Sequence, residues 1–456
     1  MSLFGAMNTA VSGLSAQSSA FGNISDNVAN SQTVGYKRVD TSFIDYLTTS
    51  TADNNVPGSV VTRPDYVNNV EGTITQTDNP LGLAITGQGF FAVSTQAGTA
   101  NNLPTFAAQQ EYTRAGDFQM DKNGYLVNSA GEFLNGWPVT TDPTTGANVV
   151  NQNTLKPIQV SQTVFNPIAT GTVTLSANLP ATPTAGTATA AAPISSDIDV
   201  YDSLGTMHTV TLKWQLNPVA VGPPAVPANN WTVNVSIPDD AAFTGSANVT
   251  FGTGAAGGLP AGTVSALDTP NGNVIVGAAY NPANPAAQPA SLTLNADFGS
   301  GAQPIKINLG NYGGTSGVTQ YAGTDYNLRG LTQDGVPPGA FSSVSTATNG
   351  DIAVNYDNGQ SRVIARVPLV TFNDPNGLQR QNGQAFTASQ YSGGPLAETA
   401  STNGAGGLVT QSVEGSNVDI ATEFSKLIVA QEAYSANTKM VTSADQMLQQ
   451  TVNMKQ

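Results

Sequence analysis

Three aspartates near the middle of the chain have the residue type and spacing of a candidate acid–base or calcium site. Asp197, Asp199 and Asp202 lie close together, and paired carboxylates can hydrolyse a glycoside or bind Ca²⁺. Asp197 and Asp199 alternate with Ile198 and Val200, however, which is the pattern of a half-buried strand with a polar outer face. The alternation favours a structural role, and a secreted carbohydrate-active enzyme that uses Asp197 and Asp199 is kept as a rival hypothesis.

The chain offers very little material for other catalytic centres. It contains no cysteine and a single histidine, His208. Disulfides, thiolate nucleophiles and cysteine-based metal sites are therefore excluded, and histidine clusters are impossible. His208 follows a turn at 202–205 and begins a second alternating segment with Val210, Leu212 and Trp214, so we expect it to start a strand.

Two short motifs resemble ligand-binding loops. Gly252–Gly257 matches the spacing GxGxxG, but a dinucleotide site needs a helix directly afterwards, and Pro260 and Gly262 follow instead. Asp117, Asp121 and Asn123 loosely match a calcium loop without its remaining ligands or its closing glutamate. We interpret both as turns, so the sequence predicts no catalytic, cofactor-binding or metal-binding residues and no enzyme.

The charge of the chain excludes several classes of partner. Of 456 residues only 10% are charged, and the formal net charge is -15. An acidic surface repels phosphate, so we expect no nucleic-acid partner and no membrane insertion. The first basic residue is Lys37, which predicts no ordinary cleaved signal peptide. Low charge and the absence of cysteine nevertheless suggest an extracellular protein. Export without a cleaved signal would reconcile an extracellular location with the lack of an ordinary signal peptide.

The first expected secondary-structure element is a helix at the N-terminus. Its apolar stripe has alternating spacings of four and three residues, which is a heptad pattern. Gly5, Gly13 and Gly22 interrupt it, and each costs roughly 1 kcal/mol relative to alanine. We therefore expect this helix to form mainly on assembly. The candidate core positions are Leu3, Met7, Leu14, Phe21, Ile24 and Val28.

A second, longer helix is expected at the C-terminus, from about 417 to 453. Ser416 and Asp419 could begin it as a capping box. Its candidate core positions repeat every seven residues and are Leu427, Tyr434, Val441 and Leu448. The two terminal helices either pack onto the middle of the chain or pair with each other and with other copies, and the heptads favour the second alternative.

Between the helices the sequence reads as strands and turns. Segments 112–114, 118–120, 125–127 and 133–137 are separated by turn residues and predict an antiparallel meander. Residues 352–356 and 362–372 flank Asn358-Gly359, which is a strong hairpin signal. If these two residues are the centre of the turn, Asp357 pairs with Gln360. The same register then pairs Val354 with Val363, Ile352 with Ala365 and Asp351 with Arg366.

The expected fold is mainly β with long α-helical termini and nested discontinuous domains. The helices pair as a coiled-coil-like core, with two or more β domains outside it. The predicted parts are a helical core domain (1–30 plus 417–456), connecting segments (31–71 plus 396–416), an inner β domain (72–159 plus 334–395) and an outer β domain (160–333). Residues 215–330 match no fold pattern that we can place.

Four segments together resemble one family. Residues 23–38, NISDNVANSQTVGYKR, strongly resemble the N-terminal signature of bacterial flagellar axial proteins, the rod and hook family. Residues 87–93 (GQGFFAV), 200–205 (VYDSLG) and 414–419 (EGSNVD) are similar to further family segments in the expected order. The N-terminal match includes Asn27, Asn30, Gly35 and Tyr36.

The resemblance implies a structural protein that polymerises into a tube outside the cell and uses no cofactor. Chain length and the segment around 200–205 favour a hook member, which would be a flexible universal joint, over a distal rod or hook-associated member. The implied partners are other copies of the chain, the distal rod, the hook cap, the hook–filament junction proteins, the hook-length control protein and the flagellar type III export apparatus. Export through that apparatus would need no cleaved signal peptide.

Overall fold

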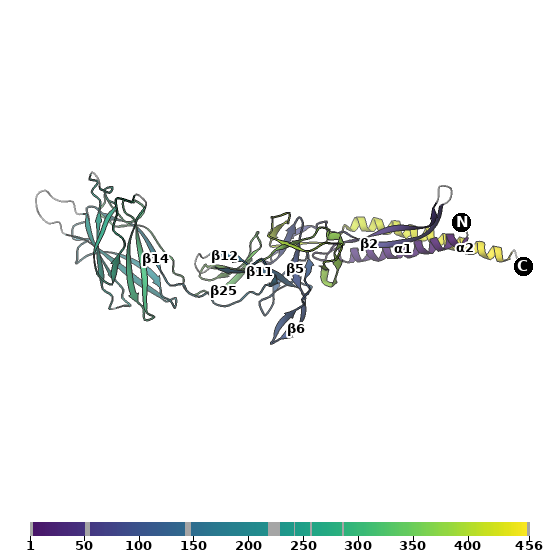
Figure 1. Ribbon diagram of the computed structural model, residues 1–456, viewed down its shortest axis with the longest axis horizontal. Coiled ribbons are helices and arrows are strands. Elements are labelled where there is room, and N and C mark those ends of the chain that lie inside the picture. Colours follow the sequence, from purple (N-terminus) through teal and green to yellow (C-terminus); the bar gives the residue numbers. More distant parts are fainter. Residues whose placement is uncertain are drawn as a thin grey trace. The chain divides into compact units, whose positions relative to one another are not determined.

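The computed structural model divides the chain into two compact units. It describes residues 3–50, 55–141, 147–217, 229–240, 242–255, 258–284 and 287–453. The first unit comprises Met1–Gln162, Ser342–Asn355 and Ser361–Gln456, and the second comprises Thr163–Phe341 and Tyr356–Gln360. The second unit is therefore an insertion within the first. Figure 1 shows both units, coloured along the chain.

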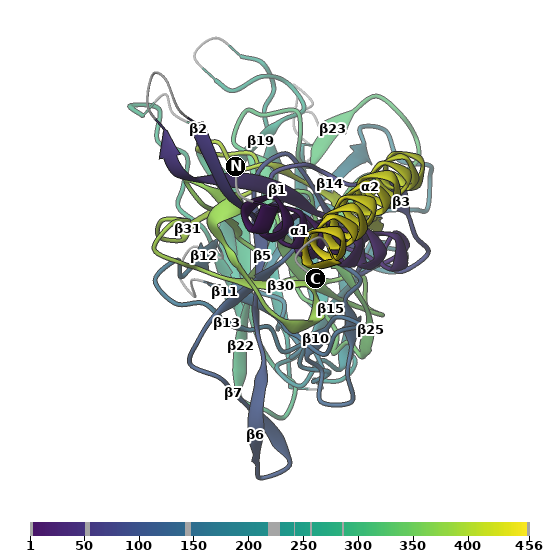
Figure 2. The same cartoon turned by 90° about the vertical axis from the view of Figure 1, so that its right-hand side faces the viewer.

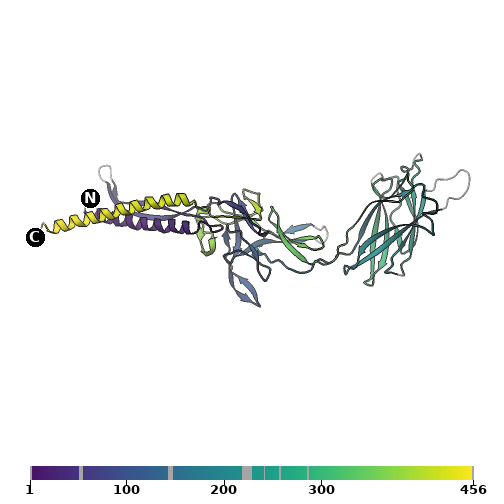
Figure 3. The same ribbon diagram turned by 180° about the vertical axis from the view of Figure 1, so that it is seen from behind.

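Two antiparallel helices form one end of the first unit. They are α1 (Leu3–Ala29) and α2 (Ile420–Asn453), and they lie side by side in Figures 2 and 3. The rings of Phe21 and Tyr434 meet edge to face with centroids 6.2 Å apart. The predicted pairing of the helical termini is therefore confirmed. With its 34 residues, α2 is about 51 Å long.

A long hairpin lies along α1. Its strands β1 (Val39–Ser50) and β2 (Asn55–Tyr66) pair antiparallel. The Thr9 hydroxyl donates to the Gly58 carbonyl, and Asn23 Nδ2 donates to Thr41 Oγ1. Residues 31–71 were expected to be a connecting segment, and Pro57, Gly58 and Pro64 obscure the strand pattern of β2. The structure shows instead that this segment widens the helical pair into a three-part layer.

The body of the first unit is a 14-stranded sheet. Its main path is β25-β26-β27-β11-β5-β8-β30-β29. Buried Phe90, Tyr112, Phe372 and Phe386 form an aromatic core beside β5 and β8. The strands are β5 (Phe90–Ser94), β8 (Glu111–Thr113), β9 (Gln119–Met120), β10 (Leu126–Val127), β11 (Phe133–Thr141), β12 (Asn148–Val150), β13 (Lys156–Pro157), β25 (Phe341–Thr346), β26 (Asp351–Tyr356), β27 (Ser361–Arg366), β28 (Leu369–Thr371), β29 (Gln379–Arg380), β30 (Ala385–Thr387) and β31 (Leu396–Glu398).

Three two-stranded sheets and two short 3₁₀ helices complete the described part of the first unit. The sheets are β3 (Ile74–Gln76) with β33 (Ser412–Glu414), β4 (Leu83–Thr86) with β32 (Gly407–Thr410), and β6 (Gln96–Ala100) with β7 (Leu103–Phe106), and the helices are η1 (Pro375–Gly377) and η2 (Asn382–Gln384). The first two sheets each pair a strand from before residue 90 with a strand from after residue 400. Long-range pairing therefore joins the two ends of the sequence even outside the helices.

The predicted meander is correct for three of its four segments. Strands β9, β10 and β11 pair in chain order. The first segment, β8, is wrong, because it pairs with β5 and β30 instead. That position buries Tyr112 in the aromatic core, a gain from distant residues that local turn signals cannot indicate.

The predicted register of the β26–β27 hairpin is correct at its base and wrong near its turn. Asp351 pairs with Arg366 and Ile352 with Ala365, as expected, but Val354 pairs with Arg362. Tyr356 N donates to the Gln360 carbonyl, so the loop has three residues and ends at Gly359, which has φ of 80°. A bulge between Ile352 and Ala353 then restores the expected pairing.

The second unit is a β-sandwich, and it supplies the fold of residues 215–330 that the sequence left unassigned. One sheet has the order β15-β16-β17-β18-β19, and the other β20-β21-β22-β14-β23 with β24 beside β14. Trp214 and Trp231 are fully buried in its core. The strands are β14 (Thr172–Pro180), β15 (Ile194–Tyr201), β16 (Met207–Leu216), β17 (Asn230–Ser236), β18 (Gly245–Phe251), β19 (Val264–Gly272), β20 (Val274–Val276), β21 (Pro289–Asp297), β22 (Ala302–Asn311), β23 (Thr319–Tyr321) and β24 (Asn327–Gln333).

Candidate functional site

The aspartates with catalytic spacing are part of a sheet surface. Asp197 and Asp199 lie on β15 and point outward, with their carboxylates accepting hydrogen bonds from the hydroxyls of Thr211 and Thr209 on β16. Asp197 pairs with Thr211 and Asp199 with Thr209 across the two strands. This alternation is the one predicted for a half-buried strand.

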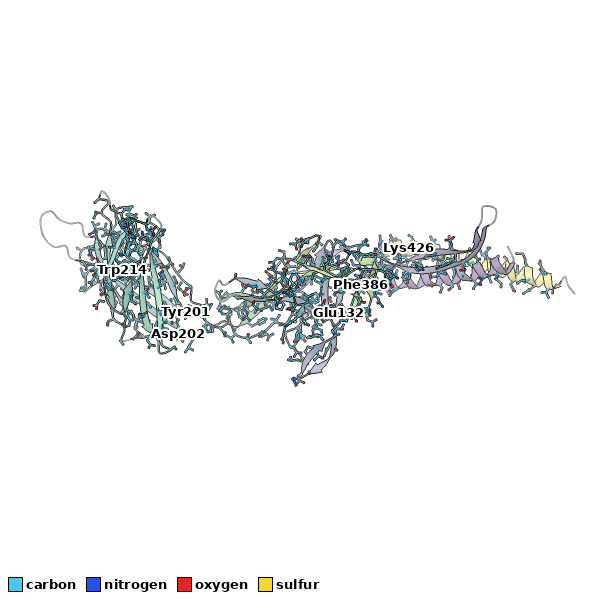
Figure 4. The ribbon with its side chains drawn as sticks, viewed as in Figure 1. Glu132, Tyr201, Asp202, Trp214, Phe386 and Lys426 are labelled. Carbon is cyan, nitrogen blue, oxygen red and sulfur yellow. The ribbon has the colours of Figure 1, made fainter. Side chains whose placement is uncertain are left out.

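Asp202 closes a tight turn, and Figure 4 labels this residue and its neighbour Tyr201. Its Oδ1 accepts hydrogen bonds from the backbone N–H groups of Leu204 and Thr206. His208 lies 2.8 Å from Asp239 through Nδ1 and stacks on Phe298 with ring centroids 4.1 Å apart. These contacts hold the end of the sandwich together, and His208 lies in β16 as predicted.

The two loop motifs are turns. Gly252 N donates to the Thr263 carbonyl and β19 follows, so no helix N-terminus faces the GxGxxG segment, whose last two positions lie outside the described residues. Asp121 Oδ1 accepts hydrogen bonds from Asn123 N and Tyr125 N within a hairpin turn. Within the described ranges no three histidine, aspartate or glutamate side chains are grouped to hold a metal ion, and no helix there is long and apolar enough to cross a membrane.

The predicted core positions differ in burial along the two helices. On α1, Ile24 is buried, whereas Met7, Leu14, Phe21 and Val28 are half-buried, and the side chain of Leu3 lies outside the described residues. On α2, Leu427, Val441 and Leu448 are half-buried, whereas Tyr434 is 43% exposed although its ring meets that of Phe21. The Phe21–Tyr434 contact joins the two stripes within one chain.

Two apolar surfaces on α2 lie outside the heptad column; the sequence pattern places Met440 and Met447 beside that column but does not single out the other four residues. We name them flank A (Ile420, Phe424 and Ile428) and flank B (Val429, Met440 and Met447), and their six side chains are between 40% and 67% exposed. Successive helix residues rotate by about 100°, which places the flanks roughly 110° to either side of the seam with α1. Their signal was visible in the sequence as large apolar residues outside the heptad column. A helix of this kind can contact two further neighbours.

An apolar groove runs beside the helical seam. It has a volume of about 590 Å³ and lies between α1, β1 and α2. Its apolar lining includes Ala20 and Ile24 of α1, Phe43 of β1, and Val429 and Ala430 of α2. Flank B therefore continues into a concave surface rather than standing alone.

Asn27 joins the three elements that meet at the base of the helices. Its side chain is fully buried. Nδ2 donates to the Val39 carbonyl at 3.0 Å and to Glu423 Oε2 at 3.1 Å. Oδ1 accepts from Val39 N at 3.0 Å and lies 3.1 Å from the Tyr36 hydroxyl. Both donors and both lone pairs of this amide are thus used.

The other positions of the N-terminal match shape the exit from α1. Asn30 Nδ2 donates to the Asp26 carbonyl one turn back. Gly35 has φ of 71°, and a Cβ there would lie 2.4 Å from Ala115 N, so the close approach requires glycine. Tyr36 is buried under the Arg380 guanidinium, 4.5 Å from its ring centroid, and burial raises the pKa of Tyr36 to about 12.

Three buried charges fasten this exit to the sheet. Glu414 Oε1 accepts from Lys37 Nζ at 2.5 Å and Oε2 accepts from Arg114 Nη1 at 2.9 Å. Burial by itself would raise the pKa of Glu414, but the charges of Arg114 and Lys37 outweigh it and hold that pKa below its usual value. Removing one member of a buried charge group leaves the others uncompensated and costs about 3–5 kcal/mol. Sequence reasoning missed this triad because its members are up to 377 residues apart.

The start of α2 differs from the predicted capping box. Asp419 is the cap, since its Oδ1 accepts hydrogen bonds from Ala421 N and Thr422 N. Ser416 bonds only to Val418 N among the described contacts, so it lies before the helix. Asn417 accepts from Arg38 N at 2.7 Å and donates to the Val67 carbonyl. The segment that precedes α2 is therefore bound to the segment that follows α1.

The fold and the paired ends define a class of protein, the flagellar axial proteins. Four family profiles match successive parts of the chain, from residue 7 to residue 454, and leave residues 38–83 and 337–408 unmatched. They are described as flagella basal body rod protein (residues 7–37), flagellar hook protein FlgE/F/G D1 domain (84–175), flagellar basal body protein FlaE D2 domain (174–336) and flagellar basal body rod FlgEFG protein C-terminal (409–454). The first profile covers Asn27, Asn30, Gly35 and Tyr36.

Within this class the chain belongs to the flagellar hook protein FlgE family. It is 31% identical to the flagellar hook protein FlgE of Brucella suis over 460 aligned residues, which cover all of both chains. It is 29% identical to the flagellar hook protein FlgE of Escherichia coli, with 99% of this chain and all of that protein covered. A solved structure, the hook protein FlgE2 of Helicobacter pylori, aligns over 73% of this chain and 98% of its own with 13% identity and a TM-score of 0.47.

Proposed function

We propose that this chain polymerises with copies of itself into the wall of the bacterial flagellar hook, a tube that acts as a universal joint between motor and filament. The paired helices α1 and α2 form the inner layer of that wall, and the β units lie outside it. Membership of the hook protein family supports this assignment. The chain acts as a structural subunit and catalyses no reaction.

The observation that carries the proposal is the exposure of apolar side chains on α2. Flanks A and B lie on opposite sides of the seam with α1, and flank B adjoins the apolar groove. A surface patch of this kind is typical of an interaction site. Two different flanks on one helix suit heterologous contacts, which generate a helical polymer when the rotation does not close. The occupant that we assign to each flank is another copy of this chain.

The buried contacts at the base of the helices support torque transmission. Glu414 binds Lys37 and Arg114, while Asn27 and Lys426 connect α1 and β1 to α2 (Figure 4 labels Lys426). A force on the helices therefore reaches the rest of the first unit through the buried contacts of Asn27 and Glu414 and the half-buried Lys426–Asp40 pair. Exposed ion pairs would contribute much less to such a joint.

The proposed location is the flagellar hook outside the cell, reached by export without a cleaved signal peptide. Proposed partners besides other copies are the distal rod, the hook cap, the hook–filament junction and hook-length control proteins, and the flagellar type III export apparatus. A distal rod or hook-associated role is the alternative within the axial class. A carbohydrate-active enzyme is disfavoured, since Asp197 and Asp199 lie on an open strand face and are bound by threonine hydroxyls.

A single substitution in each flank tests the proposal. Ile428→Asp in flank A and Met440→Asp in flank B should abolish tubes in electron micrographs of the purified, concentrated chain, because each places a charge in an apolar interface. Leu14→Asp and Leu427→Asp should also abolish tubes, by separating α1 from α2. Circular dichroism of all four variants should retain the β signal. Ser443→Asp is the control, since Ser443 lies on the exposed face between the flanks, and normal tubes from the flank variants would contradict the proposal.

A further inference from the structure

The apolar seam between α1 and α2 does not by itself define how the two helices are aligned. Its large side chains repeat every seven residues on both helices, so sliding one helix by seven residues again places apolar groups opposite apolar groups. Much of the buried remainder is alanine, which interlocks weakly. The repeating positions are Met7, Leu14, Phe21 and Val28 on α1 and Leu427, Tyr434, Val441 and Leu448 on α2, and the buried alanines are Ala10, Ala16, Ala20, Ala430 and Ala444.

The structure nevertheless has one alignment. Asn27 hydrogen-bonds Glu423, and a Cβ on Gly13 would lie 3.0 Å from Asn437 Nδ2. Residues 13 and 27 are 14 apart, as are 423 and 437. The two contacts therefore report the same antiparallel register, two heptads apart.

We propose that Asn27 and Glu423 are a register lock that selects this alignment among the apolar alternatives. Both side chains of this hydrogen bond between the helices are buried: Asn27 is 0% and Glu423 1% exposed. Sliding in one direction would place the Glu423 carboxylate against Ala20, and sliding in the other would place the Asn27 amide against Ala430. Each slip therefore buries a polar group without its partner, and such groups are costly.

Neighbouring contacts connect the Asn27–Glu423 pair to β1. Glu423 Oε1 accepts from Lys426 Nζ at 2.7 Å, and Lys426 Nζ also donates to Asp40 Oδ1 at 2.6 Å on β1. Asn27 is bound to both backbone groups of Val39 on the same strand. A slipped α2 would lose the Glu423–Asn27 and Lys426–Asp40 contacts together, and keep only the Lys426–Glu423 pair within the helix. A single buried asparagine that fixes register at some cost in stability is a known device of coiled coils.

Disulfide trapping tests the lock directly, because the chain contains no cysteine. Three cysteine pairs are introduced one at a time into the full chain: Gly13→Cys with Asn437→Cys for the native register, and Gly13→Cys with Ala430→Cys or with Ala444→Cys for the two slipped registers. Each is oxidised with copper phenanthroline under assembly conditions. Intrachain cross-links are then separated from interchain cross-links by denaturing gel electrophoresis and identified by mass spectrometry.

In the otherwise unchanged chain only the native pair should cross-link above background. Adding Asn27→Leu with Glu423→Leu keeps the seam apolar and removes the lock, so cross-linking of a slipped pair should rise about tenfold. Glu423→Gln keeps an acceptor for Asn27 and should preserve the native register. Asn23→Leu is the matched control, since the Asn23 amide bonds Thr41 of β1 and its loss should leave the register unchanged.

Three results would overturn the proposal. Slipped pairs that stay at background in the leucine double variant would mean that the connection from β33 to α2, held by Asn417 and Glu414, sets the register by itself. Loss of all three cross-links in that variant would mean that Asn27 and Glu423 hold the helices together rather than align them. Slipped cross-links in the unchanged chain would exclude a unique register altogether.

Discussion

At the scale of single residues, one buried carboxyl has a protonation state that the fold alters. Glu132, labelled in Figure 4, directly precedes β11 and is buried in the turn that joins β10 to β11. Its Oε2 accepts from Asn128 Nδ2 at 2.7 Å. Burial raises the pKa of Glu132 to about 7, and the nearby charges of Glu111 and Asp117 add to that rise while the Asn128 hydrogen bond opposes it.

The raised pKa predicts a pH-dependent stability of the first unit. Between pH 4.5 and about 7 the folded state binds the Glu132 proton more tightly than the unfolded state, so the free energy of unfolding falls as pH rises through that window. The full change is about 3 kcal/mol at 1.36 kcal/mol per pKa unit. Glu132→Gln should remove most of this fall and make the unit more stable than the unchanged chain at pH 8.

Urea unfolding at pH 5 and pH 8, read by pulse proteolysis of peptides that span β11, measures the effect. Glu398→Gln on β31 is the control, because it removes a carboxylate that bonds Asn403 near the surface. An identical pH dependence in Glu132→Gln and in the unchanged chain would show that Glu132 is ionised freely in the folded state.

Residue-scale predictions from the sequence succeeded where the cause was local. The alternation around Asp197 correctly indicated an outward-facing strand, because the period of a strand is set by the strand itself. The partners of Lys37 were not predictable, since Glu414 and Arg114 reach it from segments far along the chain. Asn27 could be singled out by its motif, but its role depends on Glu423, which lies 396 residues away.

At the scale of elements, features with a local cause were again predictable from the sequence, and features set by distant contacts were not. Heptads and the absence of proline identified both terminal helices, and Asn358-Gly359 identified the β26–β27 hairpin. The details that failed were those fixed by contacts with other elements: the bulge beside Ile352, the position of β8 between β5 and β30, and the hairpin β1–β2 along α1. Local pattern selects an element, while burial against distant neighbours selects its partner.

The helices also carry a prediction about when they form. Flanks A and B stay exposed in a single chain, and Gly5, Gly13 and Gly22 weaken α1. We expect the helical ends to be disordered in the dilute monomer and ordered in the polymer. Limited proteolysis of the monomer should leave a core that starts after about residue 30 and ends before about residue 417.

Limited proteolysis of sedimented tubes provides the comparison with the monomer. There the peptides from α1 and α2 should be protected, because neighbouring copies cover their apolar flanks. Full protection of both helices in a chain shown to be monomeric by light scattering would contradict a disorder-to-order transition and would mean that the seam with α1 is sufficient to stabilise them.

At the scale of the whole molecule, the two units have different surface chemistry. The second unit contains three basic residues between Thr163 and Phe341, which are Lys213, Lys306 and Arg329. Arg329 is engaged internally, donating to the Gly317 carbonyl at 2.6 Å and to Thr319 Oγ1. Few cations are therefore left to form ion pairs with other copies. The exposed apolar side chains of α2, by contrast, belong to the first unit.

This difference predicts that assembly and bending depend on different units. A tube that bends as it rotates must let outer contacts separate and re-form in each revolution, and tightly packed interfaces favour discrete arrangements over such gradual change. We expect the first unit to hold the polymer together and the second to form contacts that slide.

Replacing Thr163–Phe341 with a short Gly/Ser linker between Gln162 and Ser342 should therefore leave tube formation intact. Electron micrographs of the resulting tubes should show altered curvature, and a lower persistence length would indicate loss of stiffness. The matched control inserts the same linker beside Gln162 without the excision. If the excised chain is folded by circular dichroism and secreted at the level of the control but forms no tubes, the second unit is required for assembly and the proposed division between the units is wrong.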